Sequence, residues 1–416
     1  MFTVDARLKR LEGLERLDTE DIFQATYRKH MKKPLISKIA ILVYDIFSVL
    51  IFPIAICRYI HYKVHVFLGY YLFVPAQFLS KKDKKKDYSD ESIKPEEDVK
   101  EVKQKKYIRE GRQNLKKVFN AQIVNIKTAD GAKLNGVFVP GEDALGRTLR
   151  QNGPLIIFFL GQTGMYEDLG KGRFQEVLKN IRNHNVLVFN ERGVLKSSSI
   201  ATRKGLYLDA EAILQFAKKR LKVPKEKIVL HGHSFGGVKA TYLASKHREI
   251  KLLNDRSFGS SDKAIYYMAK DMFHKVFSVC FLMPLYLIEK FASQNISNKV
   301  KNFLKRYEIS KDYKLLRPIF LVKMIRAATS VAAFICAKIT VIFGWKLTPE
   351  KDWQKVKDKK FILFLRDDET IPYEASFFKA VKKKEKQFIR ILDPNCIHWT
   401  AMAPDIYSVA LKALEA

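Results

Sequence analysis

The sequence predicts an α/β protein built around a mainly parallel sheet, on the basis of three observations. Short apolar runs, such as residues 154–160 and 185–189, are typical of strands that are buried on both faces. Segments with helical spacing of apolar residues, such as 208–221, lie between them, so that strand and helix alternate. The alternation breaks near Ser261 and resumes at 361–365, which indicates a long insertion.

These boundaries divide the chain into four expected parts. They are a membrane-associating helical region with a charged linker at 1–117, the first part of the α/β core at 118–261, a helical cap or lid at 262–360, and the second part of the core at 361–416. Within the insertion, residues 276–288 and 327–345 are expected to form apolar helices. We interpret them as a lid over the carboxyl edge of the sheet, where such folds bind ligands, and ordinary core packing is the alternative.

An apolar block near the N-terminus predicts a helical hairpin. Residues 39–57 contain one charged side chain, Asp45, and have the length that a helix needs to cross a bilayer core. A basic segment at 58–63 separates them from a second apolar run at 64–79. Because Lys and Arg flank the block on both sides, we expect both ends on the cytosolic face of a membrane. Two helices buried against the rest of the protein are the alternative.

The charge balance points to an acidic partner. The net charge is +32, with 76 Lys and Arg against 44 Asp and Glu. Nucleic acid and anionic lipid are the usual partners of such a surface, and a lysine-rich solvated exterior is the alternative. Residues 81–117 are expected to be a solvated linker or an exposed helix without interleaved aromatic residues, so no nucleic acid is expected. The four cysteines show no CxxC spacing, and neither a metal nor a cofactor is expected.

The segment 229–237 reads VLHGHSFGG and carries the pattern Gly-x-Ser-x-Gly around Ser234. The pattern is weak evidence when it stands alone. Here an apolar strand precedes it, a helix follows, and Gly232 and Gly236 supply the small flanks that a nucleophile elbow requires. We therefore predict that Ser234 is a nucleophile and that the two histidines within the motif are local packing groups.

A serine nucleophile needs a base and a carboxylate that orients the base. Acidic residues at 367–369 follow the apolar strand 361–365, and His398 follows the next apolar run at 388–392. In a parallel sheet, both positions meet the nucleophile at the carboxyl edge, so His398 is the predicted base. The oxyanion is expected to bind the backbone N–H groups of Phe235 and of Gln162 in the loop 160–164.

Four segments together resemble the α/β-hydrolase superfamily, in particular its lipase, thioesterase and serine-aminopeptidase-like branch. They are an early DG-x-x-L-x-G hairpin at 128–136, an oxyanion loop at 160–164, an NERG loop at 190–197 in place of the family's D-x-R-G, and an acid loop at 366–372. The resemblance implies that Asp368, four residues before Pro372, is the catalytic acid, and that Asp255 is the alternative acid. Leu160 and Leu365 depart from the family pattern, in which His and Gly occupy these positions.

More loosely, the apolar N-terminal block and the long insertion resemble the CHLPS and SidB-type lipase-like proteins of intracellular bacteria. That resemblance implies a bacterial effector that is delivered into a host cell. Together, these features predict a membrane-associated serine hydrolase that cleaves an ester or thioester of a lipidic acyl substrate through an acyl-enzyme. A catalytically silent membrane adaptor and a serine peptidase are the alternatives.

Overall fold

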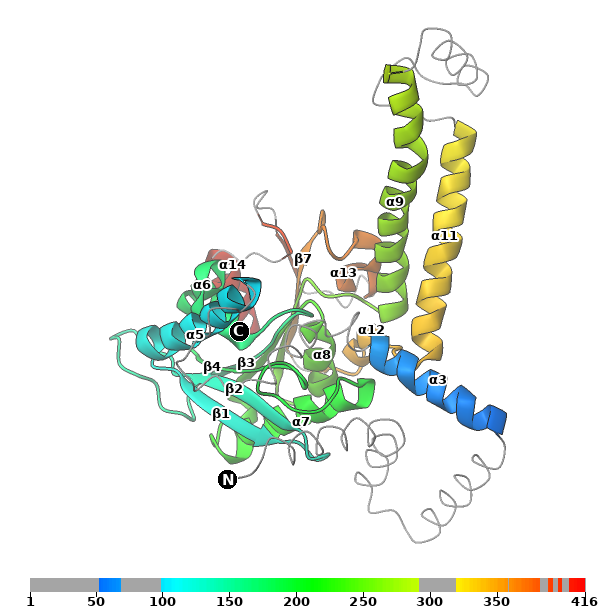
Figure 1. Cartoon of the computed structure of the whole chain (residues 1–416). Helices are drawn as coiled ribbons and strands as arrows, with labels where there is room; N and C mark the ends of the chain where they lie inside the picture. Colours follow the sequence, from blue (N-terminus) through cyan, green and yellow to red (C-terminus); the bar gives the residue numbers. More distant parts are fainter. Residues whose placement is uncertain are drawn as a thin grey trace.

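The computed structural model describes residues 52–68, 99–291, 319–357, 359–381, 388–391, 396–398 and 404–415 (Figure 1). Its centre is a sheet of eight strands in the order β1-β2-β4-β3-β5-β6-β7-β8. The strands are β1 (Gln122–Lys127), β2 (Lys133–Val139), β3 (Leu155–Phe159), β4 (Asn185–Phe189), β5 (Ile228–His233), β6 (Lys251–Asp255), β7 (Lys360–Leu365) and β8 (Phe388–Ile391). β2 is antiparallel to both neighbours, and β3 to β8 are parallel. The predicted class is therefore confirmed.

Helices cover both faces of the sheet (Figure 1). One face packs against α5 (Val99–Phe119), α6 (Gly172–Asn180) and α14 (Pro404–Glu415), and the other against α7 (Arg203–Lys219), α8 (Gly236–Lys246), α12 (Pro349–Trp353) and α13 (Phe377–Ala380). Successive residues of β3 alternate between the two cores, with Ile156 and Phe158 in one and Leu155 and Ile157 in the other. Single turns of 3-10 helix lie at η2 (Tyr166–Gly170), η3 (Lys225–Lys227) and η5 (Tyr373–Ala375).

Of the segment 81–117, which the sequence predicts as a solvated linker or an exposed helix, residues 81–98 lie outside the described residues. Residues 99–117 belong to α5, a helix with an exposed outer face and a docked inner face. Ile108 and Leu115 on its inner face are buried, and Leu115 belongs to one of the two sheet cores. Arg112 Nε donates to Glu167 Oε1 of η2 at 2.9 Å. The charges that suggested full solvation occupy the outer face, whereas the spaced apolar residues dock this helix on the α/β core.

The helix α3 (Phe52–Leu68) runs without a break through the basic segment 58–63, so the chain does not turn at that segment. The rest of the two apolar runs, at 39–51 and 69–79, lies outside the described residues, and the hairpin stays a prediction. α3 is joined to the insertion at His65. Its ring stacks on Trp345 at 5.0 Å, and the Trp345 indole N–H donates to the His65 carbonyl at 2.9 Å.

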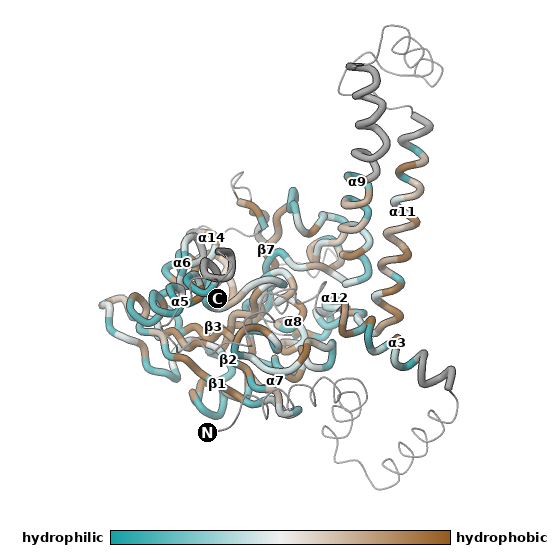
Figure 2. The backbone as a smooth tube through the Cα atoms, in the orientation of Figure 1, coloured by the Kyte–Doolittle hydropathy of each residue, from teal (hydrophilic) through white to brown (hydrophobic). Residues whose placement is uncertain are grey.

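The insertion contributes a pair of long helices, α9 (Ser261–Phe291) and α11 (Ile319–Ile342), which lie side by side and project from the body of the molecule (Figure 1). Their inner ends join the apolar cluster around Phe235, through Ala264 and Ile265 of α9 and Trp345 after α11. Figure 2 shows α11 as apolar along most of its length. The predicted role of the insertion as a lid stays a prediction.

Candidate active site

The nucleophile turn between β5 and α8 is tight and strained. Ser234 has φ +52, a left-handed backbone conformation that residues other than glycine rarely adopt. A Cβ on Gly232 would lie 2.6 Å from the Gly236 carbonyl oxygen, and one on Gly236 would lie 2.0 Å from the Phe159 carbonyl oxygen. Both flanks therefore require glycine. The Ser234 N–H donates to the Asp255 carbonyl at 2.8 Å, which fixes the turn on β6.

The structure brings together three of the predicted residues, Ser234, Asp368 and His398. His398 Nε2 lies 2.8 Å from Ser234 Oγ, and His398 Nδ1 lies 2.8 Å from Asp368 Oδ2. The three are buried, with exposed fractions of 4% for Ser234, 0% for His398 and 9% for Asp368. Because a carboxylate only accepts, Nδ1 carries the proton shared with Asp368, which leaves Nε2 free to accept from the Ser234 hydroxyl.

The carboxylate of Asp368 is oriented by its own loop. Asp368 Oδ1 accepts the backbone N–H groups of Thr370 at 2.8 Å and of Ile371 at 2.7 Å, so that Oδ2 faces His398. The neighbouring Asp367 is exposed. Of the acidic residues at 367–369, the geometry thus selects the one that the family resemblance implied.

The alternative acid, Asp255, has other partners. Its carboxylate accepts from Arg256 Nε at 2.8 Å and Arg256 Nη2 at 3.1 Å, and it lies 3.4 Å from His231 Nε2. Burial by itself would raise the pKa of Asp255, but the Arg256 guanidinium and the hydrogen bond from His231 hold that pKa well below its ordinary range. Asp255 is therefore the counter-charge of a buried arginine and does not contact His398.

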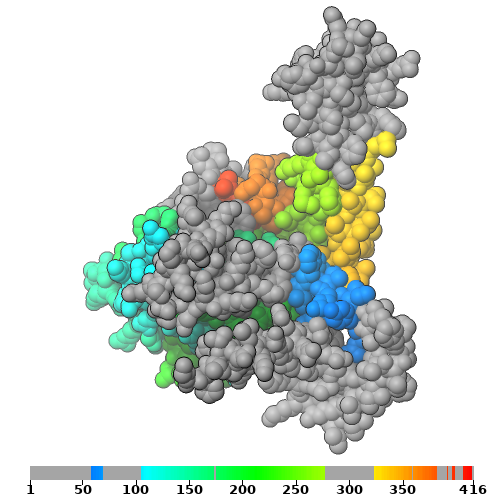
Figure 3. All heavy atoms as spheres, viewed as in Figure 1, coloured from blue at the N-terminus to red at the C-terminus, as the bar shows by residue number. Residues whose placement is uncertain are grey.

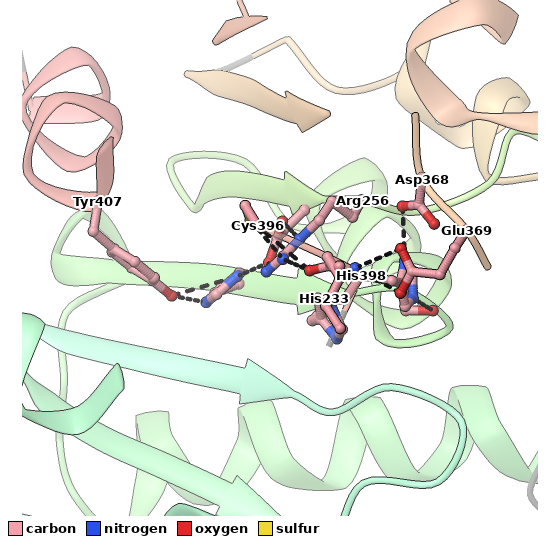
Figure 4. A network of polar contacts seen from close by, with 11 residues as sticks. His233, Arg256, Asp368, Glu369, Cys396, His398 and Tyr407 are labelled. Atoms are coloured by element: carbon pink, nitrogen blue, oxygen red, sulfur yellow. Dashed lines mark hydrogen bonds and ion pairs between the residues drawn. The ribbon is translucent and has the colours of Figure 1, made fainter. Parts of the chain in front are cut away.

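Three side chains hold the backbone around His398 (Figure 4). Arg256 Nη1 donates to the Ile397 carbonyl at 3.0 Å, and His233 Nε2 donates to the His398 carbonyl at 2.9 Å. The His398 N–H donates to the Glu369 carboxylate, at 3.0 and 3.1 Å from its two oxygens. Sequence reasoning missed these contacts, since they join β5, β6 and the acid loop to a residue far along the chain.

The two histidines of the motif lie outside the Ser234–His398 pair, as expected for packing groups. The ring of His231 stacks on Phe158 at 4.5 Å, and its Nδ1 is hydrogen-bonded to the Tyr407 hydroxyl. Burial lowers the pKa of His231 and lowers that of His233 still further, which favours neutral rings for both at pH 7.

The predicted oxyanion loop lies next to the elbow. A Cβ on Gly236 would lie 2.7 Å from the Leu160 carbonyl oxygen, which places the start of the loop 160–164 against the first turn of α8. The loop closes through a hydrogen bond from the Gly164 N–H to the Gly161 carbonyl at 3.1 Å. This closeness is compatible with Phe235 and Gln162 both serving the oxyanion, and their roles stay predictions.

The NERG loop stabilises the surroundings of the elbow with three buried ion pairs. Arg192 Nη1 donates to Asp130 at 2.7 Å, and Arg192 Nε donates to Asp209 at 2.9 Å, so the early hairpin is joined to α7. Glu191 forms an ion pair with Lys239 of α8, and both side chains are 3% exposed. Burial lowers the pKa of Lys239 to about 7. Across the described ranges, no three His, Cys, Asp or Glu side chains form a group that could hold a metal ion.

Comparison with known proteins supports the fold and the nucleophile segment. A family model described as alpha/beta hydrolase fold matches residues 154–255, which include β3 to β6 and Ser234. The "Uncharacterized protein F37A4.1" of Caenorhabditis elegans is 31% identical over 132 residues, which are 32% of this chain and 25% of that protein. The "Uncharacterized membrane protein YNL320W" of Saccharomyces cerevisiae is 34% identical over 86 residues, which are 20% of this chain and 30% of that protein. The chain thus covers less than a third of either relative.

Among solved structures, the esterase Pf2001 of Pyrococcus furiosus is similar over 72% of this chain and 92% of its own, with a TM-score of 0.42 and 17% identity. The match of the family model takes in the strand, the turn and the helix that present Ser234. The strand order, with one antiparallel strand beside a parallel sheet, agrees with that match. The family model and the strand order together show that the chain has the α/β-hydrolase fold.

Proposed function

We propose that the protein is a serine hydrolase that cleaves a carboxylic ester or thioester through an acyl-enzyme. The observation that carries this proposal is the continuous chain of contacts from Ser234 Oγ through His398 to Asp368, each 2.8 Å long. The α/β-hydrolase fold supports hydrolysis as the reaction class. The strained φ of Ser234 adds support, because the serine of a nucleophile elbow sits on a sharp turn between a strand and a helix in this conformation.

In the proposed reaction, Ser234 Oγ attacks the acyl carbon while its proton passes to His398 Nε2. Asp368 stabilises the imidazolium that forms, and the N–H groups of Phe235 and Gln162 bind the oxyanion. His398 then protonates the departing alkoxide or thiolate, which leaves the acyl group on Ser234. A water molecule gives a proton to His398 and attacks the acyl-enzyme, and the carboxylic acid is released as Ser234 regains its proton.

We further propose that the substrate is a lipidic acyl compound at the cytosolic face of an anionic membrane. The net charge of +32 favours anionic headgroups. Among the described residues, one helix, at Lys323–Ile342, is long and apolar enough to cross a membrane. The yeast relative carries the name of a membrane protein.

A fluorophosphonate probe tests the nucleophile, since it labels a serine only where a base activates that serine. We expect the folded wild type to be labelled and Ser234→Ala to be unlabelled, with at least a ~10³-fold loss of ester hydrolysis. Ser245→Ala is the control, because Ser245 lies on α8 and its hydroxyl donates to the Tyr242 carbonyl at 2.7 Å. Labelling that persists in Ser234→Ala would contradict the assignment, and a folded wild type without labelling would favour the silent adaptor.

The leaving group is then identified with matched esters, thioesters and amino-terminal peptide amides that carry the same acyl group. We expect turnover of the ester or thioester to exceed turnover of the amide, with rates that rise with acyl length. Faster turnover of the amide would favour the serine peptidase.

A further inference from the structure

The helix α11 carries its large apolar side chains on the outside. Side chains that face into the pair with α9 are mostly small, and the buried ones are Ile325, Thr329, Ala333, Ala337 and Thr340. The exposed side chains include large apolar ones, with exposed fractions of 53% for Met324, 59% for Val331, 53% for Phe334, 51% for Ile335 and 66% for Ile342. A helix pair in water has the opposite arrangement, with large apolar residues inside. Small residues at the contact and large ones outside are typical of helices packed within lipid.

The polar groups of α11 are satisfied within the helix. Its three hydroxyl side chains are those of Thr329, Ser330 and Thr340. Thr329 and Ser330 donate to the Arg326 carbonyl at 3.0 and 2.7 Å, and Thr340 donates to the Ala337 carbonyl at 2.7 Å. Hydroxyls that donate to the preceding turn remain satisfied where no water is present, as a hydrocarbon environment requires. These hydroxyls therefore need no outside partner when the helix lies in lipid.

The charges on α11 are all positive. The segment 319–342 contains no Asp or Glu, and its cations are Lys323, Arg326 and Lys338. Lys323 and Arg326 lie near the outer end, and the Lys338 ammonium lies 5.1 Å from the Phe334 ring centre, one turn away on the same helix. Long basic side chains of this kind extend along an apolar surface toward phosphate headgroups. Figure 3 shows α11 along the outer edge of the projecting pair.

We propose that the α9–α11 pair docks the protein on an anionic lipid bilayer and that the outward face of α11 enters the acyl region of one leaflet. The apolar window of 20 residues at Lys323–Ile342, with a hydropathy of 1.7 and 28% of it buried, supplies the required length. Val276 and Met272 of α9, which are 50% and 53% exposed, extend the apolar surface onto the second helix.

This inference deepens the membrane part of the proposed function and does not depend on the hydrolytic chemistry. It assigns docking to a surface separate from the N-terminal apolar block. The inner end of the pair packs against Phe235 and Phe258 in one apolar cluster, so a docked pair holds the elbow at a fixed distance from the lipid. Substrates presented from the membrane surface then reach the site without long diffusion.

Sedimentation of the full chain with vesicles of phosphatidylcholine and phosphatidylserine tests the docking surface. We expect the variant V331Q/I335Q to bind at least ~10-fold more weakly than the wild type, because two apolar side chains no longer enter the leaflet. The matched control is L145Q/I123Q, whose residues are 76% and 51% exposed and lie in the β2–β3 connection and in the edge strand β1, outside the α9–α11 pair. We expect the control to bind as the wild type does, and binding to weaken when phosphatidylserine is left out.

Thermal unfolding and turnover of a short soluble ester should be the same in V331Q/I335Q as in the wild type, because both side chains are exposed and distant from Ser234. Equal vesicle affinity of V331Q/I335Q and wild type would overturn the proposal, and so would an equal loss in the control. A wild type that self-associates without vesicles, together with a monomeric V331Q/I335Q that still sediments with them, would overturn it in favour of a second copy of the chain. Failure of all ester turnover with normal docking would affect the hydrolase assignment alone.

Discussion

Two buried aspartates, Asp368 and Asp255, have separate tasks that isosteric substitutions distinguish. Asp368 contacts His398 Nδ1, whereas Asp255 neutralises Arg256. We expect Asp368→Asn to abolish most of the activity while the protein keeps most of its stability. Asp255→Asn is expected to lower the stability while most of the activity remains. Asp367→Asn, at an exposed position of the same loop, is the control.

The loss for Asp368→Asn follows from the hydrogen bonds of its loop. The Asn oxygen can replace Oδ1 as the acceptor for the N–H groups of Thr370 and Ile371, and this directs the amide N–H₂ toward His398 Nδ1. Nδ1 must then accept, so the proton resides on Nε2, which can no longer accept from Ser234. A base in the wrong tautomer loses about 10³–10⁴-fold in kcat, or about 4–5 kcal/mol of transition-state stabilisation.

The loss for Asp255→Asn is one of stability. Arg256 is 4% exposed, and the substitution removes the carboxylate that contacts its Nε and Nη2. Removal of one partner from such a buried pair costs about 3–5 kcal/mol. Because the folded-state pKa of Asp255 is held below its ordinary range, this contribution is present above about pH 4 and declines as the pH falls toward the folded-state value. The stability difference from wild type should therefore be largest at neutral pH.

Chemical denaturation gives the free energy of unfolding, and ester turnover normalised to the fluorophosphonate-reactive fraction gives kcat for folded protein. For Asp255→Asn we expect a lower denaturation midpoint and a kcat within ~10-fold of wild type, since its site keeps Ser234, His398 and Asp368. The reasoning is refuted if Asp255→Asn loses kcat about 10³-fold at an unchanged midpoint while Asp368→Asn remains active. That result would identify Asp255 as the acid.

Three further substitutions test charged side chains away from the reaction. Burial, and then the charge of Asp262, raises the pKa of Glu350 to about 7, so the folded state retains a proton between about pH 4.5 and 7 and loses stability as the pH rises through that window. Glu350→Gln should therefore raise the free energy of unfolding at pH 8 by about 1 kcal/mol, a small value because the group is partly solvated, but not at pH 5. An equal effect at both pH values would contradict this cause. Lys239→Met and Glu191→Gln should each lower the free energy of unfolding by about 3 kcal/mol, because each leaves one buried charge without its partner. The double variant should lose less than the sum of the two, since it buries neither charge. Simple additivity in the denaturation cycle would show that the pair is not coupled.

Much of the core could be predicted because its signals are local. The apolar runs that became β3, β4 and β7 are short and bounded by turn residues, and a strand buried on both faces has this pattern. Gly232 and Gly236 bracket Ser234 in the sequence, and the structure shows why, since a Cβ at either position would clash with backbone. The carboxyl edge of a parallel sheet then brings His398 and the acid loop to the same place.

Other features could not be predicted because their signals are distributed along the chain. α5 has a high charge density, and its docked face becomes evident only when η2 and the sheet provide a surface for Ile108 and Leu115. The basic segment 58–63 separates two apolar runs in the sequence, yet α3 continues through it as one helix. The hydrogen bond from Arg256 to the Ile397 carbonyl joins positions that are far apart in the sequence, and no local pattern predicts such a contact.

The sequence by itself determined the α/β class, the nucleophile elbow and the order of serine, acid and histidine, because each rests on local patterns and on the geometry of any parallel sheet. Only the tertiary structure shows which of Asp255 and Asp368 contacts His398. Both follow strands at the same edge, but Asp368 meets the His398 ring and Asp255 meets the buried Arg256. It likewise showed which face of α11 is unpartnered. Composition indicates that a helix is apolar, whereas the packing of its neighbour decides which side chains remain exposed.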